Sequence, residues 1–120
     1  VQEQGRLFET YNVGGHNEKQ NIEIINIIID TLQEMLPADD PRRALVSKDL
    51  ITYVEDRKGH DRRYAIAPDK IKAEIGWYPE TDFATGIKKT IAWFFEHEDW
   101  MKNVTSGDYQ KYYDDMYANK

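Results

Sequence analysis

Apolar side chains recur at helical spacing between residues 21 and 36. One face with a 3.6-residue period carries Ile24, Ile25, Ile28, Leu32, Met35 and Leu36. Three more isoleucines, Ile22, Ile27 and Ile29, lie off that face. A helix that is apolar on more than one side is normally covered on more than one side. The pattern therefore predicts a helix over 21–36 that is sandwiched between other elements and ends before Pro37.

Three more helices are predicted further along the chain. A short one over 70–75 follows Pro68 and is closed by Gly76, a residue suited to the position after a helix. Another starts after Asp82, a good N-cap residue, and is expected to run to about residue 104. The last is amphipathic, and its apolar face consists of Tyr109, Tyr112, Tyr113, Met116 and Tyr117.

Two short segments have the composition of β-strands. Residues 11–13 precede Gly14-Gly15, and residues 50–54 are rich in β-branched and aromatic side chains. Two strands do not make a stable sheet on their own in water. The expected fold class is therefore α/β: a helix-rich portion with two or three short strands, completed by structure outside these 120 residues.

Composition excludes several classes of protein. The net charge of −6 argues against nucleic acid as the main partner, because phosphate backbones require a basic face. The longest apolar run, residues 27–29, is far too short to span a membrane. The chain has no cysteine, which excludes disulfides and thiolate chemistry and fits a cytoplasmic protein.

The sequence lacks the motifs of most catalytic centres. No Gly-x-Gly-x-x-Gly string occurs, and His16, His60 and His97 are too scattered to suggest a metal site. No Tyr-x-x-x-Lys motif is present either. We therefore expect no catalytic residue, no NAD binding and no metal in this chain.

The strongest candidate for ligand binding is the loop after the second predicted strand. Four of the sixteen Lys and Arg residues fall within positions 57–63. An Arg close to a Gly, as Arg57 is to Gly59, can bring its planar guanidinium to phosphate oxygens in a bidentate manner. The alternative is a solvated loop whose charges pair with one another, and composition alone favours this alternative.

Asn21 also has two interpretations. As a structural residue it is the N-cap of the 21–36 helix. As a functional residue it lies where a helix N-terminus presents free N–H groups to an anion. The two roles are compatible.

Three stretches of the chain resemble one known family. Residues 11–18 read YNVGGHNE and are followed by Asn21-Ile22, residues 51–66 read ITYVEDRKGHDRRYAI, and residues 74–79 read EIGWYP ahead of Gly86-Ile87 and Trp93. In this order they resemble the C-terminal segment of dTDP-glucose 4,6-dehydratases, within the extended short-chain dehydrogenase/reductase superfamily. The last stretch is also typical of epimerases and decarboxylases of that superfamily. The first two stretches point more specifically to the dehydratases.

The resemblance implies a cytoplasmic, homodimeric parent enzyme with an NAD-binding Rossmann domain, acting on a dTDP-sugar in dTDP-rhamnose-type synthesis. Its catalytic and NAD-binding residues would lie upstream of Val1. The substrate-binding residues that carry over are Asn21, Asp56, Arg57, Lys58, Gly59 and His60. By this resemblance, Arg57 would bind the pyrophosphate and Asn21 would contact the phosphate side of the ligand. His60 would lie near the ribose or base.

Two positions depart from the family pattern. Lys58 stands where many members have proline, and Ala67 stands where the family often has Asp. Two other interpretations remain open: the corresponding segment of another nucleotide-sugar enzyme, and a free-standing module that binds an anionic partner through residues 57–63.

Overall fold

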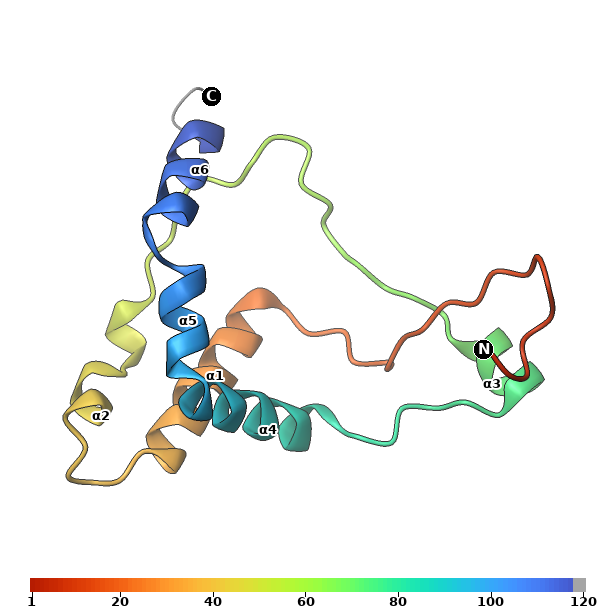
Figure 1. The fold of residues 1–120 in the computed structure, drawn as a ribbon, viewed down its shortest axis with the longest axis horizontal. Helices are drawn as coiled ribbons and strands as arrows, with labels where there is room; N and C mark the ends of the chain where they lie inside the picture. The colour runs from red at the N-terminus through yellow and green to blue at the C-terminus, as the bar shows by residue number, and fades with distance from the viewer. Residues whose placement is uncertain (118–120) are drawn as a thin grey trace. The chain divides into compact units, whose positions relative to one another are not determined.

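The computed structural model describes residues 1–117, apart from the side chains of Asp108 and Tyr117, and these residues form two compact units. The first unit comprises residues 1–83 and the second begins at Ala84. Figure 1 shows the helices, which are α1 (Asn21–Met35), α2 (Pro41–Leu45), the 3-10 helix η1 (Lys48–Leu50), α3 (Asp69–Ile75), α4 (Phe83–Glu96), α5 (Glu98–Val104) and α6 (Gly107–Tyr117).

The helix-rich part of the expected fold is confirmed, but the strands are not. Residues 1–117 contain no β-strand, so the strands predicted over 11–13 and 50–54 are wrong. Leu50 ends the 3-10 helix, and the segment after it is irregular, with Tyr53 and Val54 both 84% exposed. A strand is defined by backbone hydrogen bonds to a neighbour, which β propensity alone cannot supply.

Helix α1 forms where predicted, but its most buried positions differ from those predicted. Ile29, expected off the apolar face, is 7% exposed, whereas Ile25, expected on it, is 41% exposed. Two side-chain contacts join α1 to the chain after α2. The Gln33 side chain donates to the Val46 carbonyl at 2.7 Å, and Nζ of Lys48 lies 3.5 Å from Oδ1 of Asp30. The neighbouring segments therefore determine which face of α1 is covered.

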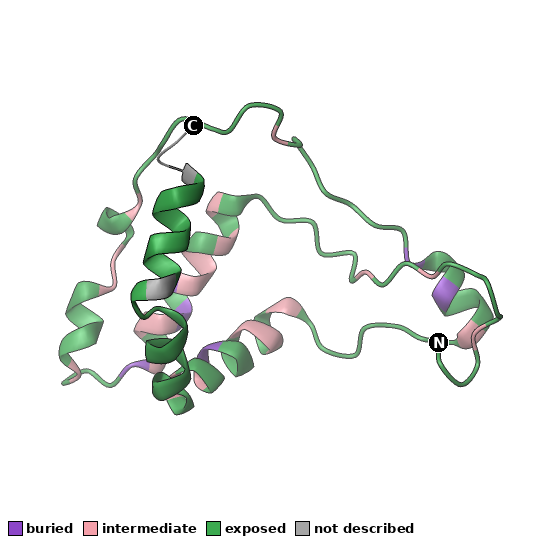
Figure 2. Ribbon diagram, turned by 45° about the horizontal axis from the view of Figure 1, so that its top comes forward, coloured by how far each residue is buried: buried purple, intermediate pink, exposed green. Residues whose placement is uncertain are grey.

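Helix α3 is attached to the N-terminal segment through side chains. Lys70 donates from Nζ to the Glu9 carboxylate at 2.5 Å and to the Thr10 carbonyl at 3.0 Å, and Arg6 pairs with Glu74. The hydrogen bond from Lys70 lowers the pKa of Glu9, and its Coulomb attraction does so further. Ile71 of α3 is buried, with 2% exposure. Figure 2 shows a buried stretch in this helix. The predicted C-terminus of this helix is confirmed, because Gly76 adopts a left-handed conformation with φ of 69°.

In the second unit, aromatic residues meet where α4 ends and α5 begins. The helix predicted from residue 83 to about 104 is interrupted at His97, where α5 begins anew. His97 stacks on Trp93 with ring centroids 4.1 Å apart, and its Nδ1 lies 2.8 Å from the Trp93 carbonyl oxygen. Trp100 meets Trp93 edge-on at 5.2 Å. Within residues 1–117, no helix combines the length and apolar character that crossing a membrane requires.

Candidate functional site

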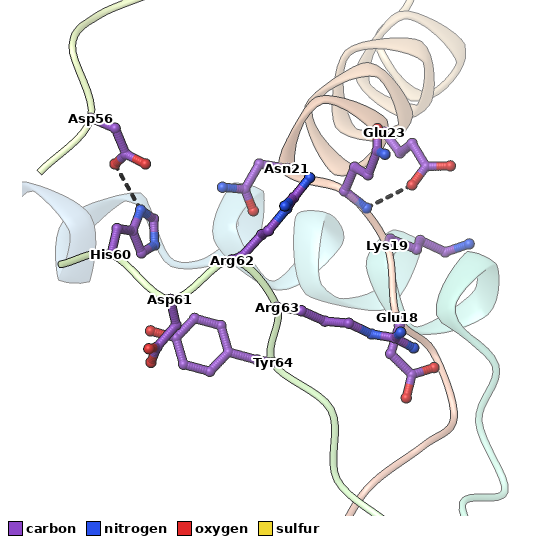
Figure 3. A pocket seen from close by; sticks show the side chains of 11 residues that line it. Glu18, Lys19, Asn21, Glu23, Asp56, His60, Asp61, Arg62, Arg63 and Tyr64 are labelled. Carbon is purple, nitrogen blue, oxygen red and sulfur yellow. Dashed lines mark hydrogen bonds and ion pairs between the residues drawn. The ribbon is translucent and has the colours of Figure 1, made fainter. Parts of the chain in front are cut away.

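Two segments of the first unit face each other across a pocket of about 870 Å³ (Figure 3). One segment is the approach to α1 and its first turn, and the other is the chain over residues 56–64. The lining residues are Glu18, Lys19, Gln20, Asn21, Glu23, Asp56, His60, Asp61, Arg62, Arg63 and Tyr64. Ligand pockets for small molecules commonly span about 300–1,000 Å³, so a nucleotide-sized molecule fits this space.

A close backbone approach brings the two segments together. A Cβ added to Gly14 would lie 3.3 Å from Cβ and Cγ2 of Ile66, so the chain at Gly14 passes directly against Ile66. Only a residue without a side chain permits this approach without displacement of its neighbour. A second hollow beside this contact is lined by 14–18 and 64–66. The glycine therefore allows the chain at residue 14 to pass directly against the chain at residue 66.

A tight turn over residues 57–60 forms one wall. The His60 amide donates to the Arg57 carbonyl at 3.3 Å, and Gly59 has φ of 73°, the left-handed conformation that favours glycine. Asp56 stands just before the turn and accepts from the Arg57 amide at 2.8 Å. Its Oδ1 also lies 2.7 Å from Nδ1 of His60. The hydrogen bond with His60 is the main reason that the pKa of Asp56 lies below its usual value.

The opposite wall is the start of α1. Gln20, and not Asn21, is the N-cap residue, so the expected capping role of Asn21 is wrong by one position. The Gln20 amide donates to the Glu23 carboxylate at 2.6 Å, which satisfies one backbone donor before the helix begins. Asn21 is the first helical residue, and its exposed side chain lines the pocket.

Arg62 and Arg63 extend into the pocket from the 60–64 segment. In Figure 3 both side chains reach toward residues 18–21 on the other wall. Tyr64 and Asp61 lie on the other side of the same segment in this view. Two guanidinium groups that line a pocket are suited to bidentate contacts with phosphate oxygens.

The structure brings together three of the predicted site residues. Asn21, Asp56 and His60 line one pocket, although they come from segments far apart in sequence. Arg57, Lys58 and Gly59 lie in the adjoining turn and are not among the lining residues, so their assignment to the substrate stays a prediction. The lining residues not proposed from sequence are Glu18, Lys19, Gln20, Glu23, Asp61, Arg62, Arg63 and Tyr64. The basic cluster at 57–63 was the signal that could have indicated Arg62 and Arg63.

The residues described do not suggest a metal centre. Across residues 1–117, no group of three or more His, Asp or Glu side chains is placed to hold a metal ion. Arginine, amide and imidazole groups line the pocket, and groups of these kinds can hydrogen-bond to an organic anion.

A pocket suited to a phosphorylated ligand, on a helix-rich chain, is consistent with a nucleotide-sugar enzyme. Residues 4–90 match the family model described as GDP-mannose 4,6 dehydratase, and the chain belongs to this family. It is 46% identical over 117 residues to a dTDP-glucose 4,6-dehydratase of Shigella flexneri, covering 98% of this chain. A dTDP-glucose 4,6-dehydratase 1 of Escherichia coli strain K12 is 44% identical over the same length.

A solved structure agrees with these sequence matches. The crystal structure of dTDP-glucose 4,6-dehydratase from Bacillus anthracis str. Ames in complex with NAD is similar, with a TM-score of 0.69 and 39% identity over 86% of this chain. The resemblance found in the sequence motifs is thus confirmed. The chain spans about 31% of the length of the Shigella relative and 29% of the Bacillus chain.

Proposed function

We propose that this chain is the C-terminal, nucleotide-sugar-binding part of an NAD-dependent dTDP-glucose 4,6-dehydratase. That enzyme converts dTDP-glucose to dTDP-4-keto-6-deoxyglucose and water. The proposed parent is a cytoplasmic homodimer of the extended short-chain dehydrogenase/reductase superfamily, with a Rossmann domain preceding this segment and a place in dTDP-rhamnose-type synthesis.

One observation carries the proposal: a 46% identical match over 117 residues to a dTDP-glucose 4,6-dehydratase includes every residue that lines the pocket. The pocket volume of about 870 Å³ is adequate for a nucleoside diphosphate sugar. The proposed substrate-binding residues remain Asn21, Asp56, Arg57, Lys58, Gly59 and His60. Of these, Asp56 acts through His60, because it holds the imidazole at 2.7 Å.

The residues of this chain do not fit NAD. A Rossmann phosphate loop needs glycines that let the backbone approach the pyrophosphate ahead of a helix N-terminus. Gly14 does precede α1, but the space on its Cβ side is filled by Ile66 at 3.3 Å. The 120 residues contain no Gly-x-Gly-x-x-Gly string. In this proposal NAD and the catalytic residues belong to the part of the parent enzyme outside this chain.

The proposal is tested by titrating the 120-residue chain with dTDP, dTDP-glucose, GDP and NAD in a calorimeter. We expect saturable binding of dTDP and dTDP-glucose, weaker binding of GDP, and no heat from NAD. The comparison of dTDP with GDP matters because the matching family model is described by a GDP-sugar and the relatives by a dTDP-sugar. Equal affinity for GDP and dTDP would contradict the dTDP assignment. Saturable NAD binding would contradict the proposal that NAD is bound outside this chain.

A free-standing anion-binding module is the second candidate, because two arginines line the pocket. It predicts similar affinity for dTDP, GDP and inorganic pyrophosphate. The same titration, extended with inorganic pyrophosphate, therefore separates the two functions.

A further inference from the structure

Four side chains of alternating charge join the N-terminal segment to α3, outside the pocket. Lys70 donates to the Glu9 carboxylate at 2.5 Å. Nη2 of Arg6 lies 3.6 Å from Oε1 of Glu9, and the same guanidinium pairs with Glu74. Lys70 and Glu74 are four residues apart on α3, a spacing that places both on one face of a helix. These four residues are the α3 clasp, and none of them lines the pocket.

The backbone of the N-terminal segment bends to meet the spacing of the charges on α3. The Glu9 amide donates to the Arg6 carbonyl at 3.4 Å, and Phe8 in this turn has φ of 63°. That left-handed conformation is costly for a bulky residue, and it persists only where the surroundings enforce it. The Phe8 side chain is fully exposed, so its own packing does not enforce the turn. The clasp contacts on either side of Phe8 account for it.

Lys70 is the centre of a network and not half of an isolated ion pair. Its Nζ also donates to the Thr10 carbonyl at 3.0 Å and lies 5.0 Å from the centroid of the Tyr11 ring, within the range of a cation–π interaction. The Tyr11 hydroxyl in turn accepts from the Arg6 amide at 3.0 Å. The hydrogen bond to Glu9 raises the pKa of Lys70, which keeps the ammonium charged. An isolated surface pair contributes little, whereas several charges in a network contribute more.

The clasp lies at the end of both pocket walls. On one side, the chain runs from the clasp to Glu18, the first lining residue. On the other side, it runs from Tyr64, the last lining residue, into α3. The two segments approach each other between these points, where Gly14 passes against Ile66. The clasp therefore joins the two walls beyond the point where their segments meet.

Two contacts determine how these segments are aligned. Thr10 meets Lys70 and Gly14 meets Ile66, so four residues along one segment correspond to four residues in the opposite direction along the other. Among residues 1–117, no backbone hydrogen bond joins 6–14 to 66–74. One point of contact is a pivot, and a second point removes the freedom to turn about it. Without the clasp, the contact at Gly14 is left as a pivot.

We propose that Lys70 is a positioning residue that, through the α3 clasp, holds the two walls of the pocket in alignment. It lines no part of the pocket and acts through the chain that leads from Thr10 to Glu18. That the pocket binds a nucleotide sugar rests on the proposed function. The alignment of the walls by the clasp is a property of the chain without ligand, so it is measured independently of binding.

The test measures the separation of the walls in the absence of ligand. The chain has no cysteine, so nitroxide labels on Asn17→Cys and Lys58→Cys, both exposed and one beside each wall, report this distance by double electron–electron resonance. Lys70→Met is compared with Lys72→Met, a matched control that is exposed on the same helix. We expect a narrow distance distribution in the labelled chain and in Lys72→Met, and a clearly broader one in Lys70→Met. Circular dichroism shows whether the helices are retained.

Rescue by charge tests the pair itself. Lys70→Arg keeps the cation and should keep the distribution narrow. Lys70→Glu places a second carboxylate beside Glu9 and should broaden the distribution most, whereas Glu9→Lys combined with Lys70→Glu restores opposite charges and should narrow it again. If the double variant is as broad as Lys70→Glu, or if Lys70→Met is as narrow as Lys72→Met, the inference is overturned.

Binding of dTDP to the unlabelled chain separates this inference from the proposed function. We expect Lys70→Met to bind dTDP roughly three- to tenfold more weakly than the original chain, and Lys72→Met to remain within about twofold of it. If dTDP does not bind the original chain while the wall distance responds as expected, the proposed function fails and the inference stands. If dTDP binds the original chain and Lys70→Met equally, the clasp does not hold the walls in their binding arrangement, and the inference is overturned while the proposed function stands.

Discussion

The Oδ1 atom of Asp56 lies 2.7 Å from Nδ1 of His60, four residues further along the chain. The same carboxylate accepts a hydrogen bond from the Arg57 amide at 2.8 Å. Because a carboxylate only accepts, it favours the tautomer of neutral His60 with the proton on Nδ1. Nε2 of that ring is then left as an acceptor, which suits a ribose hydroxyl or a base N–H. Asp56 is thus a positioning residue that acts on the ligand through His60.

Asp56→Ala removes both accepted hydrogen bonds and frees the imidazole. A typical hydrogen bond contributes about 1 kcal/mol net, so the affinity for dTDP is expected to fall roughly five- to tenfold. Nitrogen-15 spectra of His60 should change from a predominantly Nδ1-protonated ring to a mixture of tautomers. Asp56→Asn keeps an acceptor oxygen and is expected to lose less affinity. Unchanged His60 spectra in Asp56→Ala would show that the contact does not set the tautomer.

The same pair predicts a response to acid. Hydrogen bonding to His60, and secondarily to the Arg57 amide, lowers the pKa of Asp56 from its usual 3.8. A carboxylate with a lowered pKa contributes stability that is present above its usual pKa and is lost as the pH falls through the lowered value. The stabilisation that Asp56 gives the turn over 57–60 should therefore be complete at pH 5 and be lost as the pH falls below 3.8. Carbon-13 titration of the Asp56 carboxyl group measures this directly, and a midpoint at or above 3.8 would contradict it.

Two glycines provide a matched pair for testing the turn beside the pocket. Gly59 and Gly76 have nearly equal φ values of 73° and 69°, and neither has an atom within 4 Å of where a Cβ would stand. Alanine at either position therefore meets backbone strain without a clash, at a cost of about 1–2 kcal/mol. Both variants should lower the free energy of unfolding similarly in urea. Only Gly59→Ala should also weaken dTDP binding, because Gly76 caps α3, which contributes no lining residue. Equal loss of affinity in both would indicate a global effect.

Local signals in the sequence predicted α1 and α3, but neither α2 nor η1. The isoleucine spacing of 21–36, the proline after it and the glycine at 76 act within a few residues, and α1 and α3 form as they indicate. The helix from residue 83 was predicted too long, because its apolar spacing continues past His97 while the backbone does not. The strands failed for a different reason, since Tyr53 and Val54 have β propensity but no neighbouring strand.

The candidate site was predicted in part. Its motifs indicated Asn21, Asp56 and His60, which share one pocket. Arg62 and Arg63 could not be assigned from alternation along an extended segment, because the bend at Arg62 cancels that alternation. Which residues of a loop face a ligand depends on backbone direction, and composition carries no information about it.

The segment after η1 is expected to make the isolated chain associate. Tyr53 and Val54 are both 84% exposed, side by side in a stretch with high β propensity and no backbone partner. Exposed, unpaired segments of this kind pair with other chains and bind hydrophobic dyes. Val54→Lys should reduce both dye fluorescence and the apparent mass in sedimentation at high concentration. Lysine at such a position is a known device against edge pairing.

Thr52→Lys is the matched control for Val54→Lys. Thr52 is exposed in the same stretch, so the substitution adds the same charge without removing an apolar side chain. If apolar exposure drives association, Val54→Lys lowers dye binding clearly more than Thr52→Lys does. If the two variants lower it equally, added charge alone explains the effect, and the exposed Val54 is not the cause. A chain that stays monomeric and binds no dye before any substitution would contradict the prediction outright, since nothing within residues 1–117 covers this stretch.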